Sequence, residues 1–245
     1  EVTLAFENFE FIKFFQKIQS FCVVELSNFY FDIAKDRLYV SYAKDFRRRS
    51  CQTVLSLIIE NLARLIAPVM PHMSEDIWQN IPYETNEKSV FLNGWPKSSD
   101  FANEKEILEP INNLKNFRMH VNKSLEECRN KNYLGSSLEA SVRVDITCPK
   151  LIKSIEFLDD SGIKNIDNLS DWLIISKIQI GGEPWAETLV SNETEIGLIE
   201  ISKSRGEKCN RCWHYENTVG SSNEYPNLCE RCISTIRNQK KLLSN

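Results

Sequence analysis

Four of the eight cysteines form two Cys-x-x-Cys pairs near the end of the sequence. The first pair is Cys209 and Cys212, and the second, after sixteen intervening residues, is Cys229 and Cys232. Each pair turns two thiolates toward one point, and two pairs complete the tetrahedron that Zn²⁺ prefers. Because four thiolates leave no position for a water molecule, the spacing predicts one structural Zn²⁺ and no hydrolytic centre.

Two other interpretations of these cysteines are weaker. A redox pair would need only one Cys-x-x-Cys, and no βαβ pattern surrounds either pair. Disulfide pairing is the second alternative. Cysteines outside the pairs are scattered, at positions 22, 51, 128 and 148. This usage favours a reducing compartment, so we expect a cytoplasmic protein.

Side chains suited to RNA binding flank Cys212. Arg211 precedes it and Trp213 follows it. A metal site would hold both residues in place while their tips stay free, which suits phosphate contact and base stacking. An equally good interpretation is that Trp213 covers the small core of the finger, and the two roles can coexist. We expect His214 to be a spectator, because four cysteines already fill the metal shell.

Composition indicates a folded chain with a substantial core. The 245 residues are 42% hydrophobic, enough for one large domain or two to three small ones. No uninterrupted apolar stretch approaches 18 residues and no export signal opens the sequence, so we expect no membrane association. The net charge of -4 argues against a generic nucleic-acid binder.

Positive charge is nevertheless concentrated in two zones, 35–49 and 203–241, each with a net charge of +4. Such zones on an acidic protein favour local binding of a polyanion, although a solvated face is the ordinary explanation for one charge run. Arg47, Arg48 and Arg49 fall in the first turn of a predicted helix, where each opposes the helix dipole by roughly 0.3–1 kcal/mol. A phosphate backbone or nearby carboxylates would offset this cost, and we favour the phosphate.

Apolar residues at steps of three and four predict three long helices. One spans 11–33, one begins after the N-cap Asp45 and ends at Ala67 before a proline, and one spans 104–130. A short helix is predicted at 74–81, and 82–96 is predicted to be an exposed connection.

The hydrophobic period changes after Gly135. A strand buried on one side is predicted at 138–146, with further strands at 172–180 and 195–202, a short helix at 151–158 and a basic helix after Cys232. The predicted fold class is mainly α with a small α+β unit. It comprises a helical-bundle domain over 1–97 whose start is truncated, an α+β junction domain over 98–202 and a four-cysteine zinc-binding domain over 203–245.

The order of these elements resembles the C-terminal part of bacterial-type isoleucyl-tRNA synthetases over nearly the full length. Five segments resemble the anticodon-binding domain shared by the isoleucine, valine, leucine and methionine enzymes: Phe-Tyr-Phe-Asp-Ile at 29–33, Lys-Asp-Arg-Leu-Tyr at 35–39, Arg-Arg-Ser-Cys-Gln-Thr at 48–53, Ala-Pro-Val-Met-Pro-His at 67–72 and Glu-Asp-Ile-Trp at 75–78. Segments 121–126 and 137–140 match the junction region. Lys-Cys-Asn-Arg-Cys-Trp at 208–213 and Leu-Cys-Glu-Arg-Cys at 228–232 are similar to the terminal zinc element of the isoleucine enzymes.

The resemblance implies part of an isoleucine–tRNA ligase, a class I aminoacyl-tRNA synthetase, that grips the anticodon stem and loop of isoleucine tRNA. It assigns no catalytic residue to this chain, and it places ATP, Mg²⁺ and editing in sequence that is absent here. The other expected partner is the rest of the synthetase chain, and we expect a monomer. The residues implied in tRNA binding are Arg211 and Trp213 for bases or adjoining phosphates, and Arg47, Arg48, Arg49 and Lys208 for backbone charge.

Three rival interpretations remain. The chain could be the corresponding region of a sister class I synthetase of the valine type. Formamidopyrimidine-DNA glycosylases end in a comparable four-cysteine finger, but the helix-two-turn-helix that they need before it is not visible. A zinc-stapled module that binds protein is the third.

Overall fold

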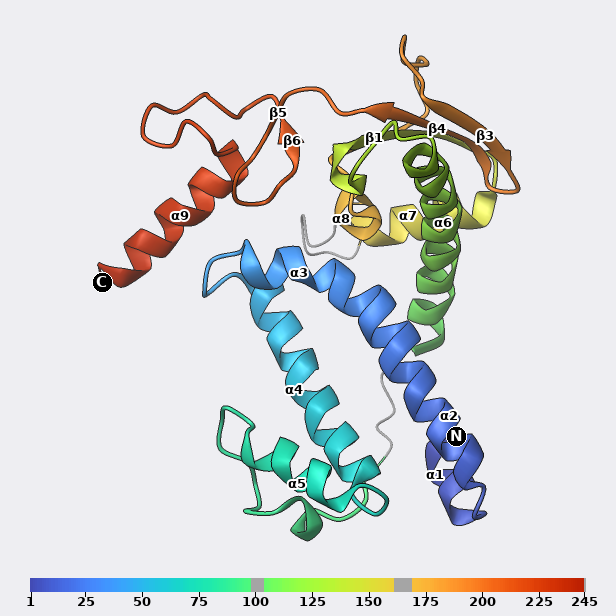
Figure 1. The fold of residues 1–245 in the computed structure, drawn as a ribbon, viewed down its shortest axis with the longest axis vertical. Coiled ribbons are helices and arrows are strands. Elements are labelled where there is room, and N and C mark those ends of the chain that lie inside the picture. The colour runs from blue at the N-terminus through green and yellow to red at the C-terminus, as the bar shows by residue number, and fades with distance from the viewer. Residues whose placement is uncertain (98–103, 161–168, 245) are drawn as a thin grey trace. The chain divides into compact units, whose positions relative to one another are not determined.

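The computed structural model describes residues 1–97, 104–160 and 169–244. Its contacts divide the chain into two compact units, one made of Glu1–Tyr42 with Lys105–Asn245 and the other of Ala43–Glu104. The first unit combines helices, a small mixed sheet and a four-cysteine element, and the described elements of the second are all helical (Figure 1). The predicted fold class, mainly α with a small α+β unit and a cysteine finger, is confirmed.

The first unit begins with helices α1 (Val2–Glu7) and α2 (Phe11–Ser20). The helix continues through a π-helical segment, η1 (Phe21–Phe31), into α3 (Asp32–Tyr39) without leaving the right-handed helical region. The predicted helix at 11–33 is thus continuous, but its middle turns are wider than α-helical ones.

The helical spacing of Phe11, Phe15, Ile18 and Leu26 predicts that they share one buried stripe of this helix, but the stripe is only partly buried. Ile18 and Leu26 are buried as expected, whereas Phe11 and Phe15 are exposed and Phe14 is buried in their place. The reason is the short helix α1, which packs against α2 so that the Phe6 ring lies 5.3 Å from the ring of Phe14.

In the second unit, α4 (Phe46–Ile66) begins where the sequence predicts. The Asp45 carboxylate accepts hydrogen bonds from the backbone N–H groups of Arg47 and Arg48, at 2.9 and 3.3 Å. This N-cap satisfies two of the free donors at the helix start. Helix α5 (Pro71–Gln79) begins three residues earlier than predicted, because proline is favoured at the first helical position.

The segment 82–96 is largely exposed, as the sequence predicts, but it is more ordered than a plain connection. It contains a short 3₁₀ helix, η2 (Val90–Leu92), in which Val90 is buried. The Glu75 carboxylate of α5 accepts from the Val90 backbone N–H at 3.1 Å, and Arg64 of α4 donates to three carbonyl groups of the segment. Side chains from two helices therefore satisfy the backbone of the loop and hold it against the unit.

Helix α6 (Glu104–Asn130) has the predicted bounds and lies against the sheet of the first unit (Figure 1). The strand order is β2-β1-β4-β3, with β1 parallel to β2 and the other pairs antiparallel. The strands are β1 (Ala140–Ile146), β2 (Lys177–Ile180), β3 (Val190–Thr194) and β4 (Gly197–Lys203). Helices α7 (Pro149–Asp160) and α8 (Leu169–Leu173) lie between β1 and β2 in sequence.

Three strand predictions need correction. Strand β1 is buried on both faces: Val142 and Val144 lie in the hydrophobic core, and Arg143 on the opposite face is buried as well. Trp172 belongs to α8 and not to a strand, and its ring packs 5.6 Å from that of Phe29. The predicted strand at 195–202 is the second arm of a hairpin. Its first arm, β3, was missed because its residues, Val-Ser-Asn-Glu-Thr, lack an apolar alternation.

None of the described helices is both long and apolar enough to cross a membrane.

Candidate metal centre and RNA interface

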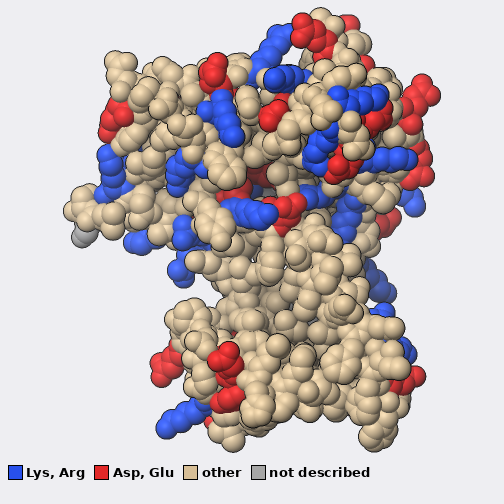
Figure 2. All heavy atoms as spheres, viewed as in Figure 1, with Lys and Arg blue, Asp and Glu red and all other residues tan. Residues whose placement is uncertain are grey.

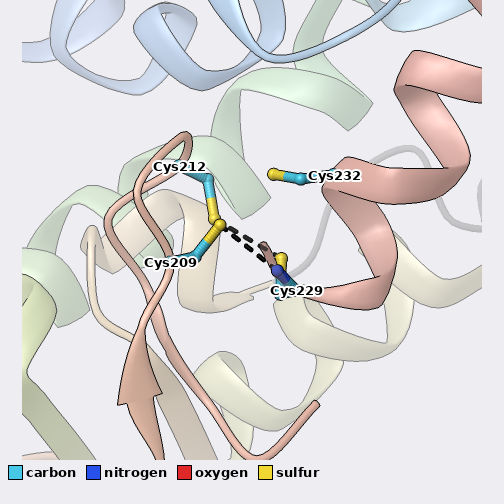
Figure 3. A group of neighbouring side chains, drawn as sticks. All are labelled: Cys209, Cys212, Cys229 and Cys232. Carbon is cyan, nitrogen blue, oxygen red and sulfur yellow. Dashed lines mark hydrogen bonds between the residues drawn. The ribbon is translucent and has the colours of Figure 1, made fainter. Parts of the chain in front are cut away.

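The sulfur atoms of Cys209, Cys212, Cys229 and Cys232 all lie within 4.8 Å of one another, and all four residues are buried. Figure 3 shows the side chains converging from a turn and from the start of a helix. Tetrahedral zinc with Zn–S bonds of about 2.3 Å separates its sulfur ligands by about 3.8 Å. The Sγ atoms of Cys212 and Cys229 are 3.7 Å apart, so the cluster fits one tetrahedral metal ion.

Short elements bring the two pairs together. The first pair lies on the turn between β5 (Glu207–Lys208) and β6 (Tyr215–Glu216), where the Cys209 N–H donates to the His214 carbonyl at 2.9 Å. Cys229 is the N-cap of α9 (Glu230–Leu243), and Cys232 lies in its first turn. The positive end of a helix dipole favours thiolates, the form of cysteine that binds metal.

The protonation of the cluster also favours a bound cation. Hydrogen bonds from the thiols of Cys212 and Cys232 lower the pKa of Cys229 to about 3. The same sharing, first with Cys212, raises the pKa of Cys232. Four thiols this close cannot all ionise unless a cation lies between them, and metal binding would therefore release protons. All eight cysteines are free thiols, so neither predicted alternative, a disulfide or a redox disulfide, is formed in this structure.

Trp213 projects from the cysteine turn with 60% of its surface exposed. Most of the residue is therefore open to solvent, which favours the binding interpretation over the one in which it covers the core of the finger. Its backbone is in the left-handed region, with φ of 66°, and its N–H donates to the Cys209 carbonyl at 2.9 Å. The ammonium of Lys208 lies 5.6 Å from the centre of the indole ring. His214 is buried and lies outside the cluster of ligand atoms.

Arg211, the other predicted RNA contact beside Cys212, has a different position from the one expected. Its Nη1 donates to the backbone carbonyl of Val40 at 2.7 Å, so the tip of the side chain is not free. Val40 is the C-cap of α3, and its side chain is buried in the same cluster as the four cysteines.

A second arginine of the finger was not among the predicted site residues. Arg231, between the cysteines of the second pair, donates both of its terminal nitrogens to the Asp36 carboxylate of α3, at 2.7 and 2.9 Å. The sequence offers only a weak signal for this pair: Asp32 and Asp36 are four residues apart, so they share one face of a helix on which a cation could bind.

The three predicted arginines of the basic zone at 35–49 lie in the first turn of α4, in the second unit. Arg49 is exposed, and Arg47 and Arg48 are half-buried. On the face drawn in Figure 2, Lys and Arg side chains are interspersed with Asp and Glu and form no single basic field.

Two family models match the sequence. The model described as the anticodon-binding domain of tRNA ligase matches residues 1–144. A second model, described as a zinc finger found in FPG and IleRS, matches residues 206–235 and includes all four clustered cysteines. Because the first match covers more than half of the sequence, the chain belongs to the family of tRNA-ligase anticodon-binding domains.

The similar curated proteins narrow this class further. Over 236 residues the chain is 58% identical to the isoleucine–tRNA ligase of Prochlorococcus marinus and 54% identical to that of a Synechococcus species. Each alignment covers 96% of this chain but only 24% of the relative. The chain thus spans about a quarter of the length of these ligases. The two matching models and these relatives agree with the resemblance drawn from the sequence.

Proposed function

We propose that this chain is the tRNA-recognition part of an isoleucine–tRNA ligase. It would bind the anticodon stem and loop of isoleucine tRNA and thereby support the ATP-dependent attachment of isoleucine. Binding at the anticodon would supply orientation at the distant acceptor end. ATP and Mg²⁺ would act in other segments of the enzyme, and no residue of this chain is given a catalytic role.

The observation that carries the proposal is the exposed indole of Trp213 beside the metal cluster. A bulky residue with positive φ is a conformational outlier, and such outliers concentrate at binding sites. An aromatic face held on a rigid turn can stack on an unpaired base of an RNA loop, which contributes about 1–3 kcal/mol. Lys208, whose ammonium lies beside the ring, would neutralise an adjoining phosphate.

We propose one structural Zn²⁺ as the metal, held by Cys209, Cys212, Cys229 and Cys232. Four buried thiols within 4.8 Å support this choice, because soft thiolates in a closed tetrahedral set select zinc. When bound, the ion would supply folding free energy to an element with little apolar core of its own.

Arg47, Arg48 and Arg49 would contact the RNA backbone as point charges at the start of α4. The Asp45 carboxylate caps this helix end and already offsets part of the opposition of the three charges to the dipole, and a phosphate would add to that compensation. We retain Arg211 in the tRNA-binding set with a changed role. One terminal nitrogen is engaged with Val40, so the rest of the guanidinium would face the RNA.

We also propose the division into a helical domain over 1–97, a junction domain over 98–202 and a zinc-binding domain over 203–245. The remaining chain of the synthetase would be the protein partner of all three. A monomer in the cytoplasm is our proposal for its state and location.

The test is binding of isoleucine tRNA, valine tRNA and duplex DNA in parallel gel shifts, with the complete natural protein loaded with zinc. We expect isoleucine tRNA to bind tightest and duplex DNA weakest. Equal affinity for the two tRNAs would contradict isoleucine specificity. Preference for the duplex would overturn the proposed function itself.

A further inference from the structure

We propose that Asp36, Val40 and Arg231 are positioning residues that lock the metal-binding element onto the end of α3 and so set where Trp213 meets the RNA. This inference rests on the proposed function, and it concerns three residues to which the proposed function gives no role. Three independent contacts between α3 and the element carry it.

The first contact is a charged one. Arg231 and Asp36 form a two-pronged pair with distances of 2.7 and 2.9 Å, and the Asp36 side chain is only 20% exposed. A fork of two parallel bonds fixes orientation as well as distance, which a single lysine contact would not. Arg231 lies between two cluster cysteines, so its backbone moves with them.

The second and third contacts converge on one residue. The Val40 carbonyl, at the end of α3, accepts from Arg211 at 2.7 Å. The Val40 side chain is 8% exposed and is the one apolar residue outside the finger that is buried in the cysteine cluster, among the described residues. The core of the metal element is therefore completed by a residue 169 positions before its first cysteine.

The other side of the element is also tied to the first unit. The Tyr215 N–H of β6 donates to the Ser176 hydroxyl at 2.7 Å, next to β2. With α3 on one side and the sheet on the other, the turn that carries Lys208 and Trp213 has a defined position. Loss of the α3 contacts would leave the cysteines able to bind metal but would loosen that position.

The substitution Asp36→Asn tests the lock, because its expected effect opposes simple electrostatics. Removing a negative charge should strengthen binding of a polyanion, whereas loosening the lock should weaken it. The matched control is Glu224→Gln, which also removes one negative charge and breaks an exposed contact with Lys240 of α9, away from α3. In the zinc-loaded complete protein we expect Asp36→Asn to weaken isoleucine-tRNA binding about three- to tenfold and Glu224→Gln to leave it unchanged or tighter.

A second readout needs no RNA. The rate at which a chromophoric chelator removes zinc reports how well the element is held, and we expect Asp36→Asn and Val40→Ala to accelerate zinc release several-fold over Glu224→Gln. The double variant Asp36→Arg with Arg231→Asp exchanges the two charges. It should recover part of the zinc retention that is lost when Asp36→Arg or Arg231→Asp is made alone.

The outcomes separate the two proposals. Zinc release and tRNA affinity that match the control would overturn the lock. Faster zinc release in a protein whose unsubstituted form does not bind isoleucine tRNA would support the lock and reject the proposed function. The lock would also be rejected if Asp36→Asn, Val40→Ala and the exchanged pair all retained zinc fully and bound tRNA with unchanged affinity.

Discussion

The ammonium of Lys208, at the end of β5, lies 5.6 Å from the centre of the Trp213 ring, and both residues are exposed next to the buried cysteine cluster. A cation over an aromatic face is attracted to it by about 0.5–1 kcal/mol at an exposed site. The ring is 60% exposed with this cation beside it, so an RNA base could reach the indole while Lys208 contributes positive charge next to it.

Replacing Trp213 by Ala should weaken the binding of isoleucine tRNA by about 1–3 kcal/mol, because a stacked base would lose its platform. Filter binding at fixed salt measures the change. Tyr133→Ala is the control, since it removes another exposed aromatic ring without touching the cysteine turn. Unchanged affinity in a Trp213 variant that still holds zinc would remove the stacking role.

Lys208→Met should act through charge. We expect tRNA affinity to fall and its dependence on salt to become shallower by about one phosphate contact, because one released counterion is lost. A titration series from low to moderate salt gives the slope. Should the slope stay the same while the affinity falls, Lys208 would act only by supporting the indole.

Removal of the metal should unfold the finger before the rest of the chain. Elemental analysis under reducing conditions should find one zinc per chain, and a strong chelator should then reduce the helical circular dichroism by the contribution of α9, whose first turn contains a ligand. Restoring zinc should recover the signal. A loss of the whole helical signal in one step would mean that the metal holds more than the finger.

The buried Arg143 should be important for stability. Its guanidinium contacts Glu200 at 2.5 Å, Asp145 at 2.6 Å and the Gly182 carbonyl at 2.7 Å, and the residue is 3% exposed. Arg143→Met leaves Glu200 without its cation and should cost about 3–5 kcal/mol in urea unfolding. The double variant with Glu200→Met should recover much of this cost. If Arg143→Met lowered the free energy of unfolding by less than an ordinary surface substitution does, the interpretation of Arg143 and Glu200 as a buried ion pair would be contradicted.

Tyr83 gives a prediction at high pH. Burial, then the hydrogen bond and charge of Glu60, raise the pKa of the Tyr83 phenol to about 12. Its ordinary value is 10, so above pH 10 the unfolded chain loses this proton first and the folded chain retains it. The contribution of Tyr83 to stability is therefore complete below pH 10 and is lost as the pH rises toward 12. Ultraviolet titration curves of the unsubstituted protein and of Tyr83→Phe should differ by one phenol that ionises above pH 10. The substitution Glu60→Gln should lower the pKa of that phenol.

Local signals predicted the features that depend on local chemistry. The Asp45 cap, the bounds of α6 and the four cysteines follow from capping, periodicity and spacing, and the structure confirms the first two and brings the cysteines together. The site residues that were missed depend on contacts between distant segments. Asp36 and Arg231 are 195 positions apart, and neither residue alone differs from an ordinary surface charge.

The errors in strand and loop prediction have the same origin. The Val-Ser-Asn-Glu-Thr arm of β3 becomes a strand because β4 pairs with it, and its own composition gives no strand pattern. The 82–96 segment is ordered by Glu75 and Arg64, which lie on two helices. In both places tertiary hydrogen bonds decide the structure, and a periodicity of one segment carries no information about them.

The wide turns of η1 have a consequence for how this chain tolerates insertions and deletions. Deleting one residue between Phe21 and Phe31, with the winding otherwise kept, would rotate everything that follows by roughly a quarter turn about the helix axis. Asp32 and Asp36 would then turn away from Arg118 of α6 and from Arg231 of the finger, their partners at 2.7 Å. The number of residues in η1 therefore decides whether Asp32 and Asp36 point toward their two arginine partners. We expect a deletion in this segment to be as damaging as a substitution in the finger.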